Sequence, residues 1–448
     1  MKTIRIGSGA GYADDRLEPA LEIIEKGDVD YIVFECLAER TIAIAQQRKM
    51  ENAEKGYDNL LAYRMEQVLP LCSANNVKVV TNMGAANPLA AAKLVKEIAE
   101  AQGLQNIKIA AVVGDDVFSE INRYSEETLL ENGRKISDIR PSIVSANAYI
   151  GAAGIAEALK NGADIVITGR AADPSLFLGP IIHEFGWALD DVDLIGKGTM
   201  AGHLMECGSQ VTGGYFADPG YKDVPDLWKV GFPILEIDEQ GELVISKLDG
   251  TGGLVSEATV KEQLIYEIHD PANYLTPDVI ADFSGAEVKQ IEKDLVKITG
   301  GSGKSKSGYL KTSIGYQEGF MIEAEISYGG SGSFDRARLA QDIVSKRLEQ
   351  ANVEPGEIRF DLIGLNSLYQ DNVKNQGTAK EVRLRVAART EELETAVAVS
   401  REVESLYTNG PAGGGGIRTN IKPIVSIGSI LIPDTDVSVK IFYSEVQK

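Results

Sequence analysis

The chain has little cysteine and little histidine, and each scarcity argues against a class of protein. Its 448 residues include only 3 cysteines and 3 histidines. Cys36, Cys72 and Cys207 are widely spaced and form no C-x-x-C pair, which argues against a disulfide framework and against a structural zinc cluster. A serine hydrolase is also unexpected, because no G-x-S-x-G elbow precedes a helix and few histidines could serve as the base.

Basic charge and long apolar runs are missing as well. The chain carries 45 Lys and Arg against 66 Asp and Glu, a formal net charge of -21, and no basic run interrupts this excess. A polyanion would be repelled, so we expect no nucleic-acid partner. No apolar run approaches the length of a membrane helix, and the apolar content after Met1 is too short for a signal-peptide core. The sequence therefore predicts a cytoplasmic protein with no membrane partner.

What the chain does contain, up to about residue 170, is short β-rich apolar runs alternating with segments of helical period. This pattern is typical of a parallel sheet in an α/β domain. Between the third and fourth runs, Asn87 as N-cap, Pro88 at the first helical position and Gly103 as terminator predict a helix. The predicted strands are "TIRIG", "DYIVFE", "VKVVTN", "IKIAAVVG", "SIVSANAY" and "ADIVITG".

The remainder of the chain has a different pattern. Residues 198–300 break the rhythm with a predicted hairpin at "PILEIDEQGELVISK", which we interpret as an inserted β elaboration covering one edge of the first domain. The last third predicts the order βαββαβ, with "DVSVKIFYSE" as its final strand, and this order indicates a ferredoxin-like α+β domain. We therefore expect an α/β N-terminal domain over residues 1–305 and a ferredoxin-like C-terminal domain over residues 306–448.

Ligands of open parallel sheets bind at the carboxyl ends of the strands. The residues expected there to bind substrate are Gly9, Gly11, Asp14, Asn82, Asp115, Arg170 and Asp173, with Glu35 as a further catalytic candidate and Glu39 close behind it. Asp173 precedes Pro174 and could instead cap a helix. The first loop, "GSGAGYADD", lacks the third glycine of the G-x-G-x-x-G fingerprint, so no nucleotide cofactor is predicted.

The stretch "GHLMECGSQVTGG" at residues 202–214 predicts a helix terminated by Gly208. On that helix His203, Glu206 and Cys207 would share one face. Three interpretations stay open: ordinary packing at a helix end, acid/base chemistry by His203 and Glu206, or a divalent metal site. We expect Cys207 chiefly to pack and Gln210 to approach a ligand.

A second glycine-rich segment, "NGPAGGGGIRTN", lies in the last third. Side chains cannot hold such a loop in place, so Gly413, Gly414 and Gly415 could form a lid or a backbone nest for an anion. A simple connection between two elements is the alternative.

Several segments together resemble the acyclic terpene utilisation family of AtuA type. They are "GAGYADDRLEPA", "ITGRAADPSLFLGP", "GHLMECGSQVTGGYFAD", "GTGGLVSEATVKEQLIYEIHDPANYLTPDV" and the "GGGG" loop, and they span nearly the whole chain. The resemblance implies an α/β domain joined to a ferredoxin-like domain, and a pathway that proceeds through branched acyl-CoA intermediates. "TGGSGKSKSGYLKTSIGYQEG" lacks the Arg-Pro-rich character of the family in this region, which leaves the ligand of this chain in question.

We predict an enzyme of small-carboxylate or acyl-CoA catabolism that uses acid/base chemistry of hydratase, lyase or isomerase type. The expected catalytic residues are His203, Glu206 and Glu35. The alternative is a non-catalytic binding or scaffold subunit that assists a partner enzyme. We expect a homo-oligomer and leave a small partner subunit open. No cofactor is predicted, and a divalent metal remains an alternative.

Overall fold

The computed structural model describes residues 2–368 and 379–447, and it mixes helices and strands in two compact units. Unit 1 comprises Met1–Gly315 and Ile427–Lys448, and unit 2 comprises Tyr316–Ser426. This division differs from the boundary expected after residue 305, because the chain leaves unit 1 within β14 (Tyr309–Gly329) and returns to it within β17 (Gly414–Pro433). Within the described ranges, no helix is both long and apolar enough to cross a membrane.

The main sheet of unit 1 has a parallel centre with antiparallel strands on both sides. Its strands follow the order β11-β12-β8-β7-β1-β2-β3-β6-β4-β18. The five neighbouring strands β1, β2, β3, β6 and β4 run parallel. The strands are β1 (Thr3–Ala10), β2 (Tyr31–Phe34), β3 (Lys78–Thr81), β4 (Ile107–Val113), β6 (Ile165–Thr168), β7 (Pro233–Asp238), β8 (Leu243–Lys247), β11 (Glu287–Glu292), β12 (Leu295–Thr299) and β18 (Lys440–Val446). The expected parallel sheet is therefore present and is widened by the predicted hairpin, β7 and β8.

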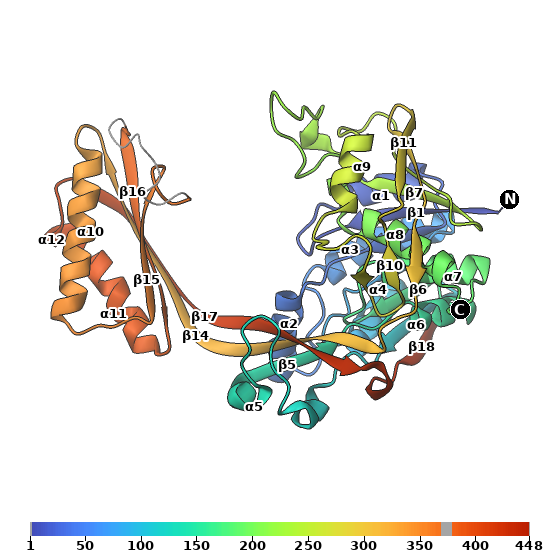
Figure 1. Cartoon of the computed structure of the whole chain (residues 1–448), viewed down its shortest axis with the longest axis horizontal. Helices are drawn as coiled ribbons and strands as arrows, with labels where there is room; N and C mark the ends of the chain where they lie inside the picture. The colour runs from blue at the N-terminus through green and yellow to red at the C-terminus, as the bar shows by residue number, and fades with distance from the viewer. Residues whose placement is uncertain (1, 369–378, 448) are drawn as a thin grey trace. The chain divides into compact units, whose positions relative to one another are not determined.

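Helices cover both faces of this sheet, as can be followed in Figure 1. Successive residues of β2 show the two layers: Ile32 and Phe34 belong to the core that contains α1, α3 and α4 residues, whereas Tyr31 and Val33 belong to the core that contains α6, α7 and α8 residues. The helices of unit 1 are α1 (Glu18–Lys26), α2 (Glu39–Glu51), α3 (Leu61–Asn75), α4 (Pro88–Ala101), α5 (Ile136–Ile139), α6 (Ala153–Lys160), α7 (Ser175–Phe185), α8 (Val192–Glu206) and α9 (Glu257–Leu264).

Two predicted strands have other partners than expected. β5 (Ile143–Ala148) pairs with β14 and takes no place in the main sheet. The segment "DVSVKIFYSE" contains β18, which pairs antiparallel with β4 in unit 1, so its assignment to the C-terminal domain was wrong. An apolar alternation shows that a strand has a buried face, but it does not identify the neighbouring strand. A separate three-stranded sheet consists of β13 (Ser302–Lys304), β10 (Ile280–Asp282) and β9 (Tyr274–Leu275).

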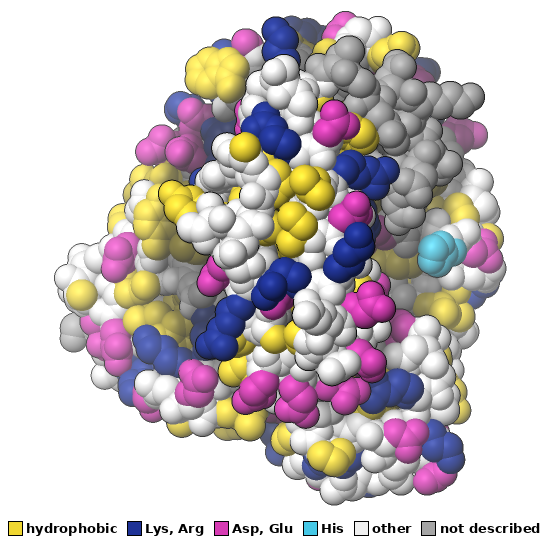
Figure 2. All heavy atoms as spheres, turned by 90° about the vertical axis from the view of Figure 1, so that its left-hand side faces the viewer, with side chains coloured by type: hydrophobic (Ala, Val, Ile, Leu, Met, Phe, Trp, Pro, Cys, Tyr) yellow, Lys and Arg dark blue, Asp and Glu magenta, His cyan; other side chains and the backbone are white. Residues whose placement is uncertain are grey.

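Unit 2 has strands in the spatial order β15-β16-β14-β17, with α10 and α11 packed on β16. Ile322 and Ile326 of β14 face the apolar core, whereas Glu325 between them faces away. On that polar face Asp361 accepts hydrogen bonds from the guanidinium groups of Arg359 and Arg385. Figure 2 shows Lys and Arg side chains lying among Asp and Glu side chains on the face it presents. The elements not yet given are α10 (Ser333–Gln350), β15 (Glu357–Ile363), β16 (Glu381–Thr390), α11 (Leu393–Glu404) and α12 (Leu406–Asn409).

Candidate functional site

The stretch "GHLMECGSQVTGG" forms the end of α8, as predicted. The helix begins where the Asp191 side chain accepts a hydrogen bond from the Leu194 backbone N–H at 3.2 Å. It ends at Glu206, and Gly208 adopts a φ of 54°, the left-handed conformation that glycine tolerates at a helix terminus. His203 and Glu206 are both buried, with 2% and 9% of their surface exposed. The helix end is therefore enclosed by the protein.

His203 and Glu206 form a hydrogen-bonded pair one helical turn apart. The Nδ1 atom of His203 lies 3.0 Å from Glu206 Oε1, and its Nε2 atom lies 3.0 Å from the backbone oxygen of Gln263. A carbonyl oxygen only accepts, so Nε2 must carry a proton and donate it. The contact between Nδ1 and Oε1 then requires a second proton, shared between the imidazole and the carboxyl group. Both ring nitrogens are occupied, so His203 holds Glu206 in place.

The second oxygen of Glu206 has no such partner. Oε2 is buried and lacks a hydrogen-bond partner among the described residues. Burial raises the pKa of Glu206, although the adjacent His203 opposes this effect. A buried carboxyl oxygen without a partner is costly unless another molecule supplies the missing hydrogen bond. Glu206 is therefore the group at this helix end that a ligand would satisfy.

Glu206 lines a cavity of about 460 Å³ in unit 1. His203, Asp173 and Glu39 line it as well, so four of the residues named from the sequence meet there. Four tyrosines and several aliphatic side chains provide most of the remaining wall. The lining residues are Glu39, Leu130, Tyr149, Ala172, Asp173, Pro174, His203, Glu206, Tyr266, Glu267, Ile268, Tyr274, Leu275, Thr276, Pro277, Ser307, Tyr309, Lys311 and Leu431.

An ion pair lies on the wall of this cavity. The Lys311 ammonium group is 3.0 Å from Glu39 Oε1, which also accepts a hydrogen bond from the Tyr149 hydroxyl. Although burial opposes its ionisation, these two partners hold the pKa of Glu39 at about 2. Glu39 is therefore an ionised counter-charge for Lys311 throughout the neutral pH range.

The predicted strand-end residues form a buried network around Arg170. Asp115 Oδ2 accepts hydrogen bonds from the Arg170 backbone N–H and from Asn147 Nδ2, both at 2.9 Å. The Arg170 guanidinium group donates to the backbone oxygen of Leu37 and pairs with Asp173. Asp173 makes no capping contact at the start of α7, so its cap interpretation was wrong. The ends of β4 and β6 are thus joined to the segment that follows β2.

Glu35 belongs to the same buried edge. Its Oε1 atom accepts hydrogen bonds from Asn82 Nδ2 and from the Leu37 backbone N–H, both at 2.9 Å. Burial raises the pKa of Glu35 to about 7, while the positive charge of Arg170 opposes the rise. None of Glu35, Asn82, Asp115 and Arg170 is among the residues that line the cavity. The structure therefore leaves these four out of the cavity lining, and Arg170 reaches the wall through its ion pair with Asp173.

The other predicted binding residues lie elsewhere. Cβ atoms built on Gly9 and Gly11 would come within 2.7 Å of the Phe34 ring and 2.2 Å of the Cys207 backbone, so the chain itself fills the space beside both glycines. Asp14 is exposed and lines no part of the cavity, and the partly buried Gln210 does not line it either. The predicted triplet Gly413–Gly415 belongs to unit 2, where Gly414 begins β17.

Sequence reasoning missed Tyr149, Lys311 and the backbone of Gln263. Tyr149 stands two residues after Asn147, at the end of a predicted strand, so its place next to the site could have been anticipated. Lys311 is separated from Glu39 by 272 positions, and Gln263 is 60 positions from His203. No local pattern signals contacts over such separations.

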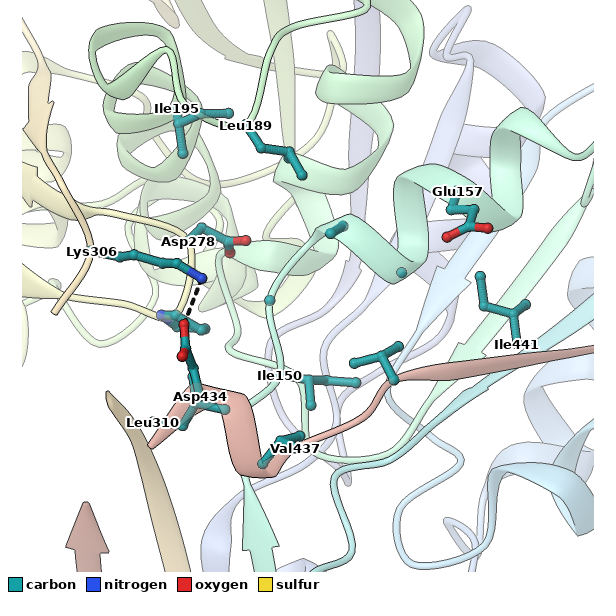
Figure 3. A pocket seen from close by; sticks show the side chains of 15 residues that line it. Ile150, Glu157, Leu189, Ile195, Asp278, Lys306, Leu310, Asp434, Val437 and Ile441 are labelled. Carbon is teal, nitrogen blue, oxygen red and sulfur yellow. Dashed lines mark ion pairs between the residues drawn. The ribbon is translucent and has the colours of Figure 1, made fainter. Parts of the chain in front are cut away.

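A second cavity, of about 310 Å³, is drawn in Figure 3. Its buried or paired charged groups have partners: Lys306 pairs with Asp434 at 2.7 Å, and Asp278 accepts hydrogen bonds from the Ser175 hydroxyl and the Ala152 backbone N–H, whereas Glu157 is exposed. Most of its wall is aliphatic. This cavity offers structural ion pairing but no buried group in need of a ligand.

The described residues include no group of three or more His, Cys, Asp or Glu arranged to hold a metal ion. All three cysteines are free, and burial raises the pKa of the Cys207 thiol. The metal-site interpretation of α8 involved His203, Glu206 and Cys207, and these three residues form no such group.

Comparison with known proteins supplies one match. The family model described as acyclic terpene utilisation family protein AtuA matches residues 4–443, nearly the whole chain. No curated protein and no solved structure matches the chain. The name of the family refers to the use of acyclic terpenes, which indicates a catabolic role. The chain belongs to the acyclic terpene utilisation family of AtuA type.

Proposed function

We propose that the chain is an enzyme that transfers a proton on an acyl substrate in the unit 1 cavity, with Glu206 as the acid/base. The observation that carries this proposal is that Glu206 lines the cavity while its buried Oε2 atom has no hydrogen-bond partner among the described residues. The pKa of Glu206 is raised above its ordinary value, and a general acid or base is most effective when its pKa lies near the working pH. The substrate is a small carboxylate or an acyl-CoA thioester.

In this proposal His203 is a positioning residue. Its Nδ1 atom shares a proton with Glu206 Oε1, and the Gln263 carbonyl fixes the orientation of the ring through Nε2. Glu206 Oε2 removes a proton from the substrate, and the hydrogen bond to His203 stabilises the carboxyl group in both protonation states. The same atom returns the proton to a neighbouring carbon or to a leaving oxygen. This sequence serves a hydratase, a lyase or an isomerase.

Lys311 is the only lysine or arginine among the described lining residues, and it can donate a hydrogen bond to a substrate carbonyl oxygen. Glu35 and Arg170 act at one remove, because neither lines the cavity. We assign them to positioning: Arg170 holds Asp173 and the segment of Leu37 in place. Glu35 was expected to be catalytic, and its location supports the indirect role.

Exchange of substrate hydrogen for solvent deuterium tests the proposal, because it reports proton transfer whatever product the reaction yields. The protein is incubated in deuterium oxide with a panel of short acyl-CoA thioesters and their free acids, and deuterium at carbon is measured by mass spectrometry. We expect at least one probe to exchange, and Glu206→Gln to slow that exchange about 10²- to 10⁴-fold. Glu325→Gln in unit 2 is the matched control and should exchange at the rate of the unaltered protein.

The outcome also addresses the alternative function. Exchange that persists unchanged in Glu206→Gln would refute the assignment of the acid/base. Absence of exchange with every probe, together with a second chain that co-purifies in stoichiometric amount, would instead favour a binding or scaffold subunit.

We further propose that unit 2 is ferredoxin-like and that the protein acts in the cytoplasm. The order β14, α10, β15, β16, α11, β17 along the chain, with β14 and β16 adjacent at the centre of the sheet, supports the first. The acidic composition and the three free cysteines support the second. A homo-oligomer remains the expected assembly.

A further inference from the structure

We infer that the unit 1 cavity admits an uncharged, largely apolar group bearing a hydrogen-bond donor and discriminates against free carboxylates. This inference rests on the cavity of the proposed function and, of its two substrate classes, favours the acyl thioester, whose acyl part carries no charge, over the free carboxylate. It follows from two independent features, the balance of charges on the wall and the unpartnered oxygen of Glu206.

The charges on the wall leave no cation for an anionic ligand. The Lys311 ammonium group is compensated by Glu39, and Asp173 is paired with Arg170. Glu267 lines the cavity too and has no ion-pair partner among the described residues. A carboxylate that entered would lose hydration, would find no free positive charge, and would face this surplus negative charge.

The rest of the wall suits an apolar chain. Leu130, Leu275 and Leu431 expose 63%, 63% and 45% of their surface, although all three line the same cavity. Exposed aliphatic side chains that gather at one cavity commonly mark a binding surface. A ligand chain that covered these leucines would gain hydrophobic stabilisation without needing a charge.

Glu206 Oε2 selects the polar atom of the ligand. The residue is 9% exposed, and this oxygen has no partner among the described residues. Tyr274, which also lines the cavity, has its ring centroid 5.5 Å from the ring of His203, so the carboxyl group lies in an aromatic setting. A hydroxyl group on the ligand can donate to Oε2, whereas a ligand carboxylate has only acceptors to offer.

Two chain-matched probes, 1-hexanol and hexanoate, test the inference by calorimetric titration at pH 8, where hexanoate is ionised. We expect 1-hexanol to bind at least about tenfold more tightly than hexanoate. Hexanoate binding as tightly as the alcohol would overturn the inference, and so would the absence of any alcohol binding. Hexylammonium binding more tightly than both would overturn it in favour of a cation site.

A charge variant makes the test sharper. Glu39→Gln removes the counter-charge of Lys311 while keeping a similar side chain, so hexanoate should gain about tenfold in affinity and 1-hexanol should bind as before. Glu54→Gln is the matched control: it breaks the exposed pair between Glu54 and Lys93, 2.8 Å apart, and changes the net charge equally, but Glu54 does not line the cavity. It should alter neither affinity, and an equal gain in both variants would contradict the inference.

The binding measurement and the exchange measurement can refute the ligand preference and the proposed function independently of each other. Tight 1-hexanol binding without deuterium exchange on any probe would refute the proposed function and leave the ligand preference standing. Exchange on free acids at the rate seen with thioesters would refute the ligand preference while leaving the acid/base role of Glu206 intact.

Discussion

Unit 1 buries charged side chains at one edge of its sheet, whereas the charged side chains of unit 2 are mostly exposed or partly exposed. In unit 1 the side chains of Glu35, Arg170 and Glu206 are almost fully enclosed. In unit 2 the one buried carboxylate, among the described residues, is Asp361, and two partly exposed arginines neutralise it directly. Burying charge is expensive. The contrast agrees with the proposal that the reaction takes place in unit 1.

The largest expected effect concerns the pair at the end of α8. His203→Ala should lower the exchange rate about 10²-fold while the protein remains folded. Because His203 holds down the pKa of Glu206, its loss should also move the acid limb of the pH-rate profile to higher pH. Arg383→Ala, which removes the cation 3.4 Å from Glu325 in unit 2, should change neither quantity. A lower rate with an unmoved profile would mean that His203 serves only packing.

The next effect compares two arginines by urea denaturation. Arg170→Met should cost about 3–5 kcal/mol of unfolding free energy, because it leaves buried carboxyl groups without their counter-charge. Arg385→Met should cost only about 1 kcal/mol, because Asp361 keeps its contact with Arg359 at 2.6 Å. Similar losses of unfolding free energy in the two variants would show that these two arginines contribute equally to stability, contrary to the difference drawn between the units.

A smaller effect should depend on pH. The folded-state pKa of Glu35 is raised by burial to about 7 from an ordinary value of 4.5, so the folded protein holds this proton more tightly than the unfolded chain. Stability therefore falls as pH rises from about 4.5 to 7. Glu35→Gln should stabilise the protein at pH 8 by up to about 3 kcal/mol, and the gain should vanish near pH 4.5. Equal unfolding free energies of the two proteins at pH 8 would show that Arg170 fully offsets the cost of burial.

The smallest effect is expected at Cys207. Its thiol is mostly buried, which raises its pKa, and it lies beside a carboxylate. Cys207→Ala should keep the exchange rate within about twofold and should cost about 1 kcal/mol or less. A large loss of activity would assign chemistry to the thiol and would show that the site extends beyond the acid/base pair.

Local signals in the sequence predicted elements well and their partners less well. The Asn87 side chain caps α4 as expected, with an oxygen 3.4 Å from the Ala90 backbone nitrogen, because capping involves only adjacent residues. Asp173 has the same kind of local signal, yet Arg170 takes its carboxylate. β18 was placed in the wrong domain because its alternation specifies a buried face without naming β4 as the neighbour.

In the candidate site too, contacts that follow from local rules were predicted, and contacts between distant segments were not. The pairing of His203 with Glu206 followed from helical spacing, and the meeting of Asp115 with Arg170 followed from the rule that parallel strands end at one edge. The place of Lys311 in the site could not be predicted from the sequence, because its contact with Glu39 depends on how distant segments pack.

The return of the chain to unit 1 has a consequence for its biosynthesis. β4 is complete early in translation, but its antiparallel neighbour β18 is made only after all of unit 2. At ordinary elongation rates β4 must wait on the order of tens of seconds with an unpaired edge. An exposed strand edge can pair with other chains, so the nascent protein should depend on chaperones during this interval. Unit 2, whose strands lie close together along the chain, can finish folding first, and the last strand then closes the sheet that was begun before it.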